Sequence, residues 1–188
     1  MDAIQVLTGR VSVAQLTGPD ISPEEEQLLF KAALRAPDHA WLRPSRYLTV
    51  RGAAREELGR IFLESAPDSA SLSDDKKEKL LNMPMRAPLI VVAICSVQEH
   101  PKVPRDEQLL STGAGVQNLL NAAWALGLGA IWRTGDVSTN PLVAKALGLA
   151  ENEVIVGFVY VGRISGEARQ PPEMVISDFV TDWTAKSL

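Results

Sequence analysis

Hydrophobic positions follow two different periods along the chain. Apolar residues recur every three or four positions in several segments, which predicts amphipathic helices. These segments are Asp2–Thr8, the stretch from Pro23 to just before Pro37, Ala53–Leu63, Asp74–Leu81, Gln108–Leu126 and Pro141–Leu147. The helix after Ser22 carries the strongest start signal, because Ser22 can cap it, proline follows and Glu25 completes a capping box.

Continuous apolar runs rich in β-branched residues predict strands. Pro88–Cys95 and Val154–Val161 are typical of strands buried on both faces, and Tyr47–Val50 and Ala130–Arg133 are shorter extended segments. Helices therefore alternate irregularly with about four strands, which favours a layered α+β or α/β domain. The polar stretch Ala66–Ser73 is predicted to be a loop.

Composition indicates one ordinary globular domain. The chain has 188 residues, of which 46% are hydrophobic and 22% charged, and its net charge is −4. With no basic stripe to attract phosphate backbones, we expect no nucleic-acid partner. A single cysteine and two distant histidines, Cys95, His39 and His100, offer no disulfide framework and no metal site.

Targeting and membrane signals are not found in this sequence. Met1–Gly9 lacks the cationic start and apolar core of a signal peptide. No uncharged apolar run approaches the about 20 residues that span a bilayer. We therefore expect a cytoplasmic protein that does not contact membranes.

Glycine-containing motifs were tested for phosphate-binding chemistry. Gly127-Leu-Gly129 follows a predicted helix rather than a strand, so it does not fit a dinucleotide-binding turn. Gly113-Ala-Gly115 lies inside a predicted helix, where small residues favour close packing of two backbones. Neither motif predicts a nucleotide site.

Two pairs of residues could bind an anionic ligand. Arg10 and Ser12 follow a helix end, and a guanidinium beside a hydroxyl suits a phosphate, although both are equally ordinary on a solvated surface. Trp132 and Arg133 occur together in glycine-rich surroundings, where a core aromatic with a surface cation is the simpler alternative.

Arg35 and His39 are weaker candidates when taken from the residues alone. Arg35 lies in the last turn of a predicted helix, where a cation complements the helix dipole. His39 follows a turn-prone Pro37-Asp38 and could simply form a local hydrogen bond.

Taken in order, six stretches of this chain resemble the flavin-dependent nitroreductase family. They are Met1–Ser12, Ala33–His39, Arg86–Ala93, Lys102–Arg105, Gly127–Gly135 and Ile155–Gly162. The resemblance implies an α+β, nitroreductase-like fold in which a central mixed β-sheet is flanked by helices, and an intertwined homodimer. It further implies a single domain over residues 1–188, with residues 163–188 forming an arm onto the partner subunit, where Phe179, Val180 and Trp183 would dock.

The resemblance also implies a set of ligand-binding residues. One FMN would lie at the subunit interface, and NADH or NADPH would be the electron donor. The residues implied for FMN are Arg10, Val11, Ser12, Arg35, His39, Ile131, Trp132 and Arg133. Those implied for the nicotinamide nucleotide are Asn121, Ala122, Ala123, Trp124, Ala125 and Leu126.

The implied activity needs no catalytic side chain, because the cofactor carries the chemistry. Hydride would pass from NAD(P)H through flavin N5 to a small electron-poor acceptor such as a nitroaromatic or quinone, with ping-pong kinetics. Val11, Gln15 and Arg43-Pro44-Ser45 depart from the family pattern near the flavin. A flavin-binding or sensing protein with little turnover, or a cofactor-free homologue, therefore remains an alternative.

Overall fold

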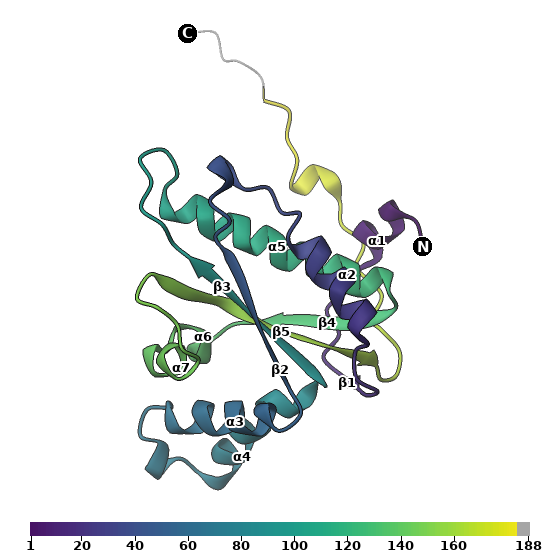
Figure 1. The fold of residues 1–188 in the computed structure, drawn as a ribbon. Coiled ribbons are helices and arrows are strands. Elements are labelled where there is room, and N and C mark those ends of the chain that lie inside the picture. Colours follow the sequence, from purple (N-terminus) through teal and green to yellow (C-terminus); the bar gives the residue numbers. More distant parts are fainter. Residues whose placement is uncertain (184–188) are drawn as a thin grey trace.

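A computed structural model describes residues 1–183. Its helices and strands alternate along the chain (Figure 1). The helices are α1 (Ala3–Gly9), α2 (Pro23–Ala33), α3 (Ala54–Glu64), α4 (Asp74–Asn82), α5 (Arg105–Ala125), α6 (Asp136–Thr139) and α7 (Pro141–Ala146). The strands are β1 (Leu16–Thr17), β2 (Ser45–Arg51), β3 (Leu89–Ser96), β4 (Leu128–Arg133) and β5 (Glu153–Ile164).

The predicted helix starts are confirmed where a side chain caps them. The Glu25 amide donates to Ser22 Oγ at 3.2 Å, and the Ser22 amide donates to Glu25 Oε2 at 2.9 Å, which completes the capping box of α2. The Leu142 amide donates to Asn140 Oδ1 at 2.9 Å at the start of α7. The longest helix, α5, begins at Arg105 rather than Gln108, directly after Pro104.

The sheet has the order β1-β5-β3-β2, and β4 pairs with β5. Every pairing among the described residues is antiparallel, so the expectation of a mixed sheet is wrong for this chain. Helices join β2 to β3 and β4 to β5, and such connections often link parallel strands, but here each returns the chain in the opposite direction. β3 is buried from Leu89 to Cys95, as its apolar run predicts.

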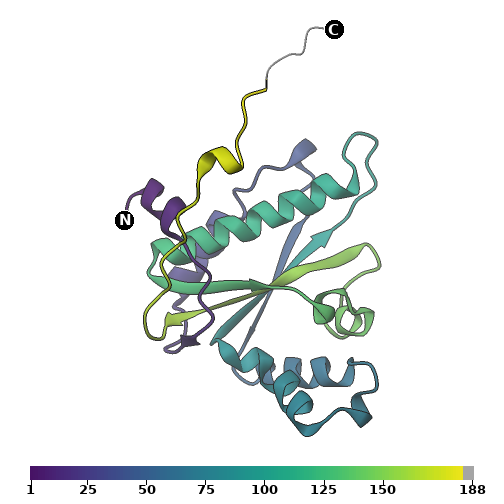
Figure 2. The ribbon, with the colours of Figure 1, turned by 180° about the vertical axis from the view of Figure 1, so that it is seen from behind.

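Helices cover both faces of the sheet (Figures 1 and 2). α2 and α5 pack on one face, where Leu29, Leu119 and Val159 belong to one buried cluster. α3 and α7 cover the other face, where Phe62 and Phe158 pack edge to face with ring centroids 5.3 Å apart. The antiparallel sheet is therefore buried between two layers of helices.

One glycine of the pair in α5, Gly115, shows the close packing that the sequence predicts. A Cβ atom at Gly115 would meet the Tyr47 hydroxyl and lie 3.1 Å from the Ala33 carbonyl oxygen of α2. Gly113 instead faces Trp132, whose Cη2 would lie 3.6 Å from its Cβ. Within the chain, Gly115 therefore permits the contact of α5 with α2 and β2.

Short elements in the loops escaped the sequence analysis. The predicted loop Ala66–Ser73 contains a 3₁₀ turn at Ser69–Ser71. β1 has only two residues, and α6 only four, so neither is long enough to show a period.

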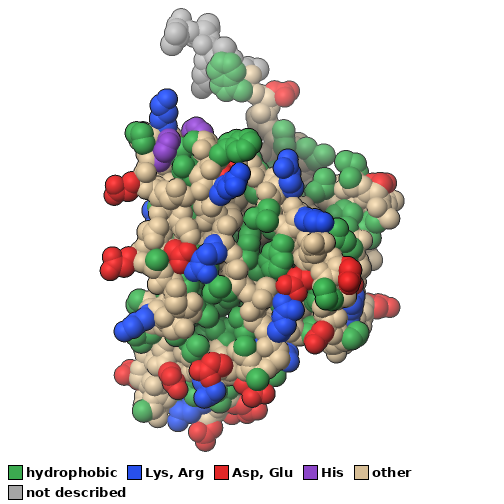
Figure 3. Space-filling model, in the orientation of Figure 1, with side chains coloured by type: hydrophobic (Ala, Val, Ile, Leu, Met, Phe, Trp, Pro, Cys, Tyr) green, Lys and Arg blue, Asp and Glu red, His purple; other side chains and the backbone are tan. Residues whose placement is uncertain are grey.

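The segment after β5 leaves the body of the protein (Figures 1 and 2). Its apolar side chains are exposed: Phe179 by 70%, Val180 by 64% and Trp183 by 87%. Hydrophobic side chains also lie open between charged ones on the face drawn in Figure 3. Among the described residues, no helix is both long and apolar enough to cross a membrane.

Candidate functional site

The segment that contains Arg10, Val11 and Ser12 follows α1 and is attached to β4. The Val13 amide donates to the Ala130 carbonyl at 3.0 Å. A Cβ at Gly9 would lie 3.8 Å from Trp124 Nε1 on α5. These contacts hold the segment against the middle of β4, the strand that ends at Arg133.

Arg10 and Arg133 each carry a buried nitrogen atom with no hydrogen-bond partner. The atoms are Arg10 Nη1 and Arg133 Nε, and Tyr47 Oη is the third such atom among the described residues. A buried polar atom left unpaired costs about 1–3 kcal/mol, and more when it is charged. The Arg133 guanidinium also lies 5.6 Å from the ring centroid of Tyr160. Two arginines with free donors suit an anion such as a phosphate.

Trp132 has a structural role as well as its predicted one. Its Nε1 donates to the Val156 carbonyl at 3.2 Å, and its ring packs between Gly113 of α5 and Gly157 of β5. A side chain at Gly157 would collide with the indole. Ile131 packs on the buried cluster of α3 and α7. The two residues therefore fix the end of β4 and with it Arg133.

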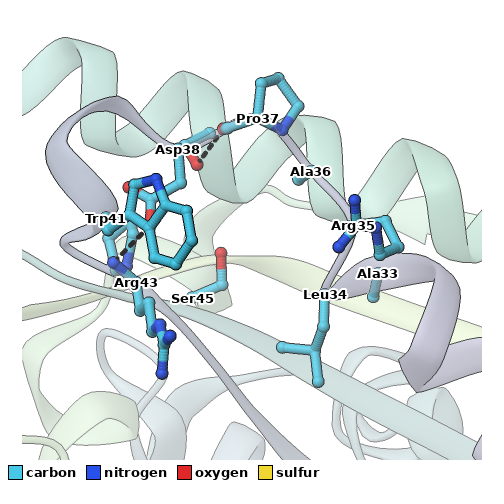
Figure 4. A pocket seen from close by; sticks show the side chains of 11 residues that line it. Ala33, Leu34, Arg35, Ala36, Pro37, Asp38, Trp41, Arg43 and Ser45 are labelled. Atoms are coloured by element: carbon cyan, nitrogen blue, oxygen red, sulfur yellow. Dashed lines mark hydrogen bonds between the residues drawn. The ribbon is translucent and has the colours of Figure 1, made fainter.

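Arg35 and His39 lie after the C-terminal end of α2, near an open pocket. The pocket has a volume of about 490 Å³ and includes Arg35 in its wall (Figure 4). Its lining residues are Ala33, Leu34, Arg35, Ala36, Pro37, Asp38, Trp41, Arg43, Pro44, Ser45 and Ser111. His39 does not line it, but it belongs to the turn between Asp38 and Trp41.

His39 is oriented by a carboxylate of α5. Its Nδ1 lies 2.7 Å from Glu107 Oε2, and both side chains are about half exposed, at 56% and 47%. A carboxylate can only accept, so Nδ1 carries a proton and Nε2 is left for another partner.

The segment that contains Arg10 and the pocket at the end of α2 contact different parts of α5 within one chain. Gly9 lies beside Trp124, whereas the Ser111 hydroxyl donates to the Pro37 carbonyl at 2.7 Å. Trp124 and Ser111 are 13 positions apart on α5, which corresponds to about 20 Å along the helix. The segment of Arg10 and the pocket wall that contains Arg35 therefore lie near opposite ends of α5, whereas Trp132, next to Arg133, packs on Gly113, two positions from Ser111.

The segment predicted to bind the nicotinamide nucleotide forms the last turns of α5. Ala123 is fully buried, and Ala122 and Leu126 pack on the core of that face. The exposed Ala125 and the half-buried Asn121 and Trp124 remain available at the surface. The nucleotide role of the segment stays a prediction.

The turn beside the pocket contains Ala40 and Trp41, which were not predicted from the sequence, and Arg43, which was noted only as a departure from the family pattern. Ala40, Trp41 and Arg43 have φ angles of 60°, 56° and 50°, in the left-handed region that non-glycine residues rarely adopt. Each such residue costs roughly 1–3 kcal/mol, and such strain is concentrated at functional sites. In the sequence, the feature that could have indicated this site is the pair Trp41 and Arg43, an aromatic and a cation after the turn-prone Pro37-Asp38.

Comparison with known proteins shows which family this chain belongs to. Residues 7–163 match the Nitroreductase family. The chain belongs to the Nitroreductase family. It is 39% identical over 163 residues to an Escherichia coli protein named "Putative NAD(P)H nitroreductase YdjA", covering 86% of this chain and 88% of that protein. A Haemophilus influenzae protein named "Putative NAD(P)H nitroreductase" is 31% identical over 183 residues, or 96% of this chain and 99% of that one.

Solved structures of nitroreductases share the fold. A nitroreductase-like protein from Bacillus cereus superposes with a TM-score of 0.85 at 24% identity, covering 96% of this chain and 95% of that one. A Desulfovibrio desulfuricans nitroreductase in complex with FMN gives a TM-score of 0.73 at 19% identity, covering 97% of both chains. These likenesses confirm the predicted nitroreductase-like fold.

Proposed function

We propose that this member of the Nitroreductase family is an FMN-dependent NAD(P)H oxidoreductase that reduces an electron-poor acceptor, such as a nitroaromatic or a quinone. The observation that carries the proposal is the pair of unpaired buried nitrogens on Arg10 and Arg133. A phosphomonoester carries a charge between about −1.5 and −2 at neutral pH, and such an anion would satisfy both guanidinium groups. FMN provides this group.

Residues near Arg10 and Arg133 complete the proposed phosphate site. Ser12 is exposed two positions after Arg10 and offers a hydroxyl donor, and Val11 offers its backbone. Trp132, held between two glycines, keeps the end of β4 in place. When bound, FMN would supply the hydride-accepting and hydride-donating chemistry at N5, so the protein has only to bind and orient the cofactor and two successive substrates.

A complete flavin site would require two subunits under this proposal. The contact of Gly9 with Trp124 and the contact of Pro37 with Ser111 lie about 20 Å apart along α5 in one chain, so Arg35 and His39 would approach the flavin held by Arg10 of the partner subunit. The exposed apolar side chains after residue 163 would then cover the partner's surface, as the arm of an intertwined homodimer. Burial of Phe179 and Trp183 against the partner would shield their apolar side chains from water, which favours the dimer.

The decisive experiment measures FMN binding to the wild-type protein and to Arg10→Gln and Arg133→Gln. Each variant removes a charge-assisted contact, so FMN should bind about 10- to 100-fold more weakly, equivalent to about 1.5–3 kcal/mol. Arg60→Gln is the matched control, because Arg60 lies on α3 and, among residues 1–183, forms its ion pair with Glu57 of the same helix. Size-exclusion chromatography of the same samples reports whether the protein is a dimer.

Reduction is then tested on the flavin-loaded protein. NADH or NADPH should bleach the flavin under anaerobic conditions, and an added nitroaromatic should restore its colour. Parallel double-reciprocal plots would support ping-pong kinetics. Bound FMN that turns over at the same slow rate with and without an acceptor would favour a flavin-binding or sensing protein instead. Wild-type FMN affinity in both arginine variants would refute the phosphate site.

A further inference from the structure

The pocket at the end of α2 has the size and shape of a small-molecule site. Its volume of about 490 Å³ lies within the range of roughly 300–1,000 Å³ that is usual for ligand pockets. In Figure 4, Trp41 and Arg43 stand on one side of the pocket, Leu34 and Arg35 stand on the other, and Ser45 lies between them. The space is therefore a slot between an aromatic wall and an aliphatic wall.

Two guanidinium groups face this slot with few partners. Neither Arg35 nor Arg43 forms an ion pair among the described residues. The carboxylate in the lining, Asp38, accepts the Arg43 backbone amide at 2.6 Å. Two arginines and one aspartate leave the lining with one net positive charge, and Asp38 is already committed to holding the turn.

The hydroxyl groups of the lining are also engaged. Ser45 Oγ donates to Thr112 Oγ1 at 3.2 Å, and Ser111 Oγ donates to the Pro37 carbonyl at 2.7 Å. The guanidinium groups are therefore the main free donors, and a guanidinium binds a carboxylate with two parallel hydrogen bonds.

Trp41 is exposed, and its backbone adopts a left-handed φ that non-glycine residues rarely adopt. The residue is 79% exposed and its φ is 56°. The Arg43 guanidinium carbon lies 5.9 Å from the centroid of the Trp41 ring. An exposed indole offers a flat apolar surface on which an aromatic ring can stack. The left-handed turn keeps the ring and the cation together at the rim of the pocket.

We propose that this pocket binds the electron acceptor and selects aromatic acceptors that carry a carboxylate or a similar anionic group. Trp41 would stack on the ring, and Arg43 would bind the anion. The inference rests on the proposed function, because the acceptor has to reach the flavin that Arg35 and His39 would approach.

The test compares two acceptors that differ only in charge, 4-nitrobenzoate and 4-nitrobenzamide. With the flavin-loaded protein, Arg43→Gln should lower kcat/KM for 4-nitrobenzoate about tenfold and change that for 4-nitrobenzamide less than about twofold. Arg43→Lys should keep most of the preference because it keeps the charge. Trp41→Asn, which tolerates the left-handed turn, should weaken both acceptors alike. Arg60→Gln is the distant control for removal of one positive charge.

Binding of benzoate, which cannot be reduced here, gives a second readout by calorimetry. Benzoate should bind the wild type and should bind Arg43→Gln about tenfold more weakly. Equal losses for both nitro compounds, or unchanged benzoate affinity in Arg43→Gln, would overturn the proposal. If the protein reduces no acceptor at all, the proposed function fails, whereas the benzoate titration still decides whether this pocket binds aromatic anions.

Discussion

The Glu153 carboxylate joins three strands at one end of the sheet. Arg46 of β2 donates to both of its oxygens, from Nε at 2.7 Å and from Nη2 at 2.6 Å. Ser96 Oγ of β3 donates to Oε1 at 2.6 Å, and the Ala150 amide donates to Oε2 at 3.1 Å. Glu153 itself begins β5, so its loss should weaken the contacts among β2, β3 and β5.

These bonds lower the pKa of Glu153 from 4.5 to about 2, chiefly through the Arg46 guanidinium. The difference between 4.5 and about 2 corresponds to at most about 3.4 kcal/mol of folding free energy. The Arg46 side chain is 38% exposed while that of Glu153 is 10% exposed, so solvent screening reduces the expected value to about 2 kcal/mol. Because the folded pKa is the lower one, this stability is present above pH 4.5 and is lost as the pH falls towards 2.

Urea unfolding of the wild type and Glu153→Gln at pH 7 and about pH 3 measures this contribution. The variant should be less stable by about 2 kcal/mol at pH 7, and more than half of the difference should be gone at pH 3. Glu57→Gln is the control, because Glu57 pairs with Arg60 where both side chains are more than half exposed. A difference between wild type and Glu153→Gln that is equal at both pH values would refute the reasoning.

Two further predictions concern packing and capping. Gly115→Ala should destabilise the protein by about 1–2 kcal/mol, because its Cβ meets Tyr47 and the α2 backbone, whereas Gly113→Ala has room and should stabilise it by up to about 1 kcal/mol. Thermal unfolding measures the change in stability of each variant. Changes of the same sign in both variants would contradict the close contact at Gly115. Ser22→Ala should cost about 1 kcal/mol through the lost cap. Ser73→Ala, at a helix start without a side-chain cap bond, should change the unfolding midpoint much less; a similar loss in both variants would contradict the capping argument.

The sequence predicted the elements whose residues repeat a pattern over several turns or pleats. β3 was expected at Pro88–Cys95 and lies at Leu89–Ser96, because an apolar run of this length suits a strand buried on both faces. The α2 start was expected from Ser22 and Pro23, because capping depends on neighbours in the chain. Segments such as Leu16–Thr17 are too short to carry a period and were missed.

The candidate site was predictable only in part. Arg10 and Arg133 could be chosen from sequence, since two cations and a hydroxyl suit a phosphate. That Arg10 Nη1 and Arg133 Nε are buried without partners depends on how α1 and β4 pack, which spacing does not reveal. The pocket wall at Trp41 and Arg43 depends on left-handed backbone angles that their side chains disfavour.

The sequence by itself therefore determined the local elements and the resemblance to the Nitroreductase family, because both are carried by short stretches of neighbouring residues. Only the tertiary structure decided that the sheet is antiparallel, that Ala123 is buried inside the segment predicted for the nucleotide, and that the segment of Arg10 and the pocket wall of Arg35 lie near opposite ends of α5. These features depend on contacts between residues far apart in sequence, whose geometry is fixed only when the helical layers pack on the sheet.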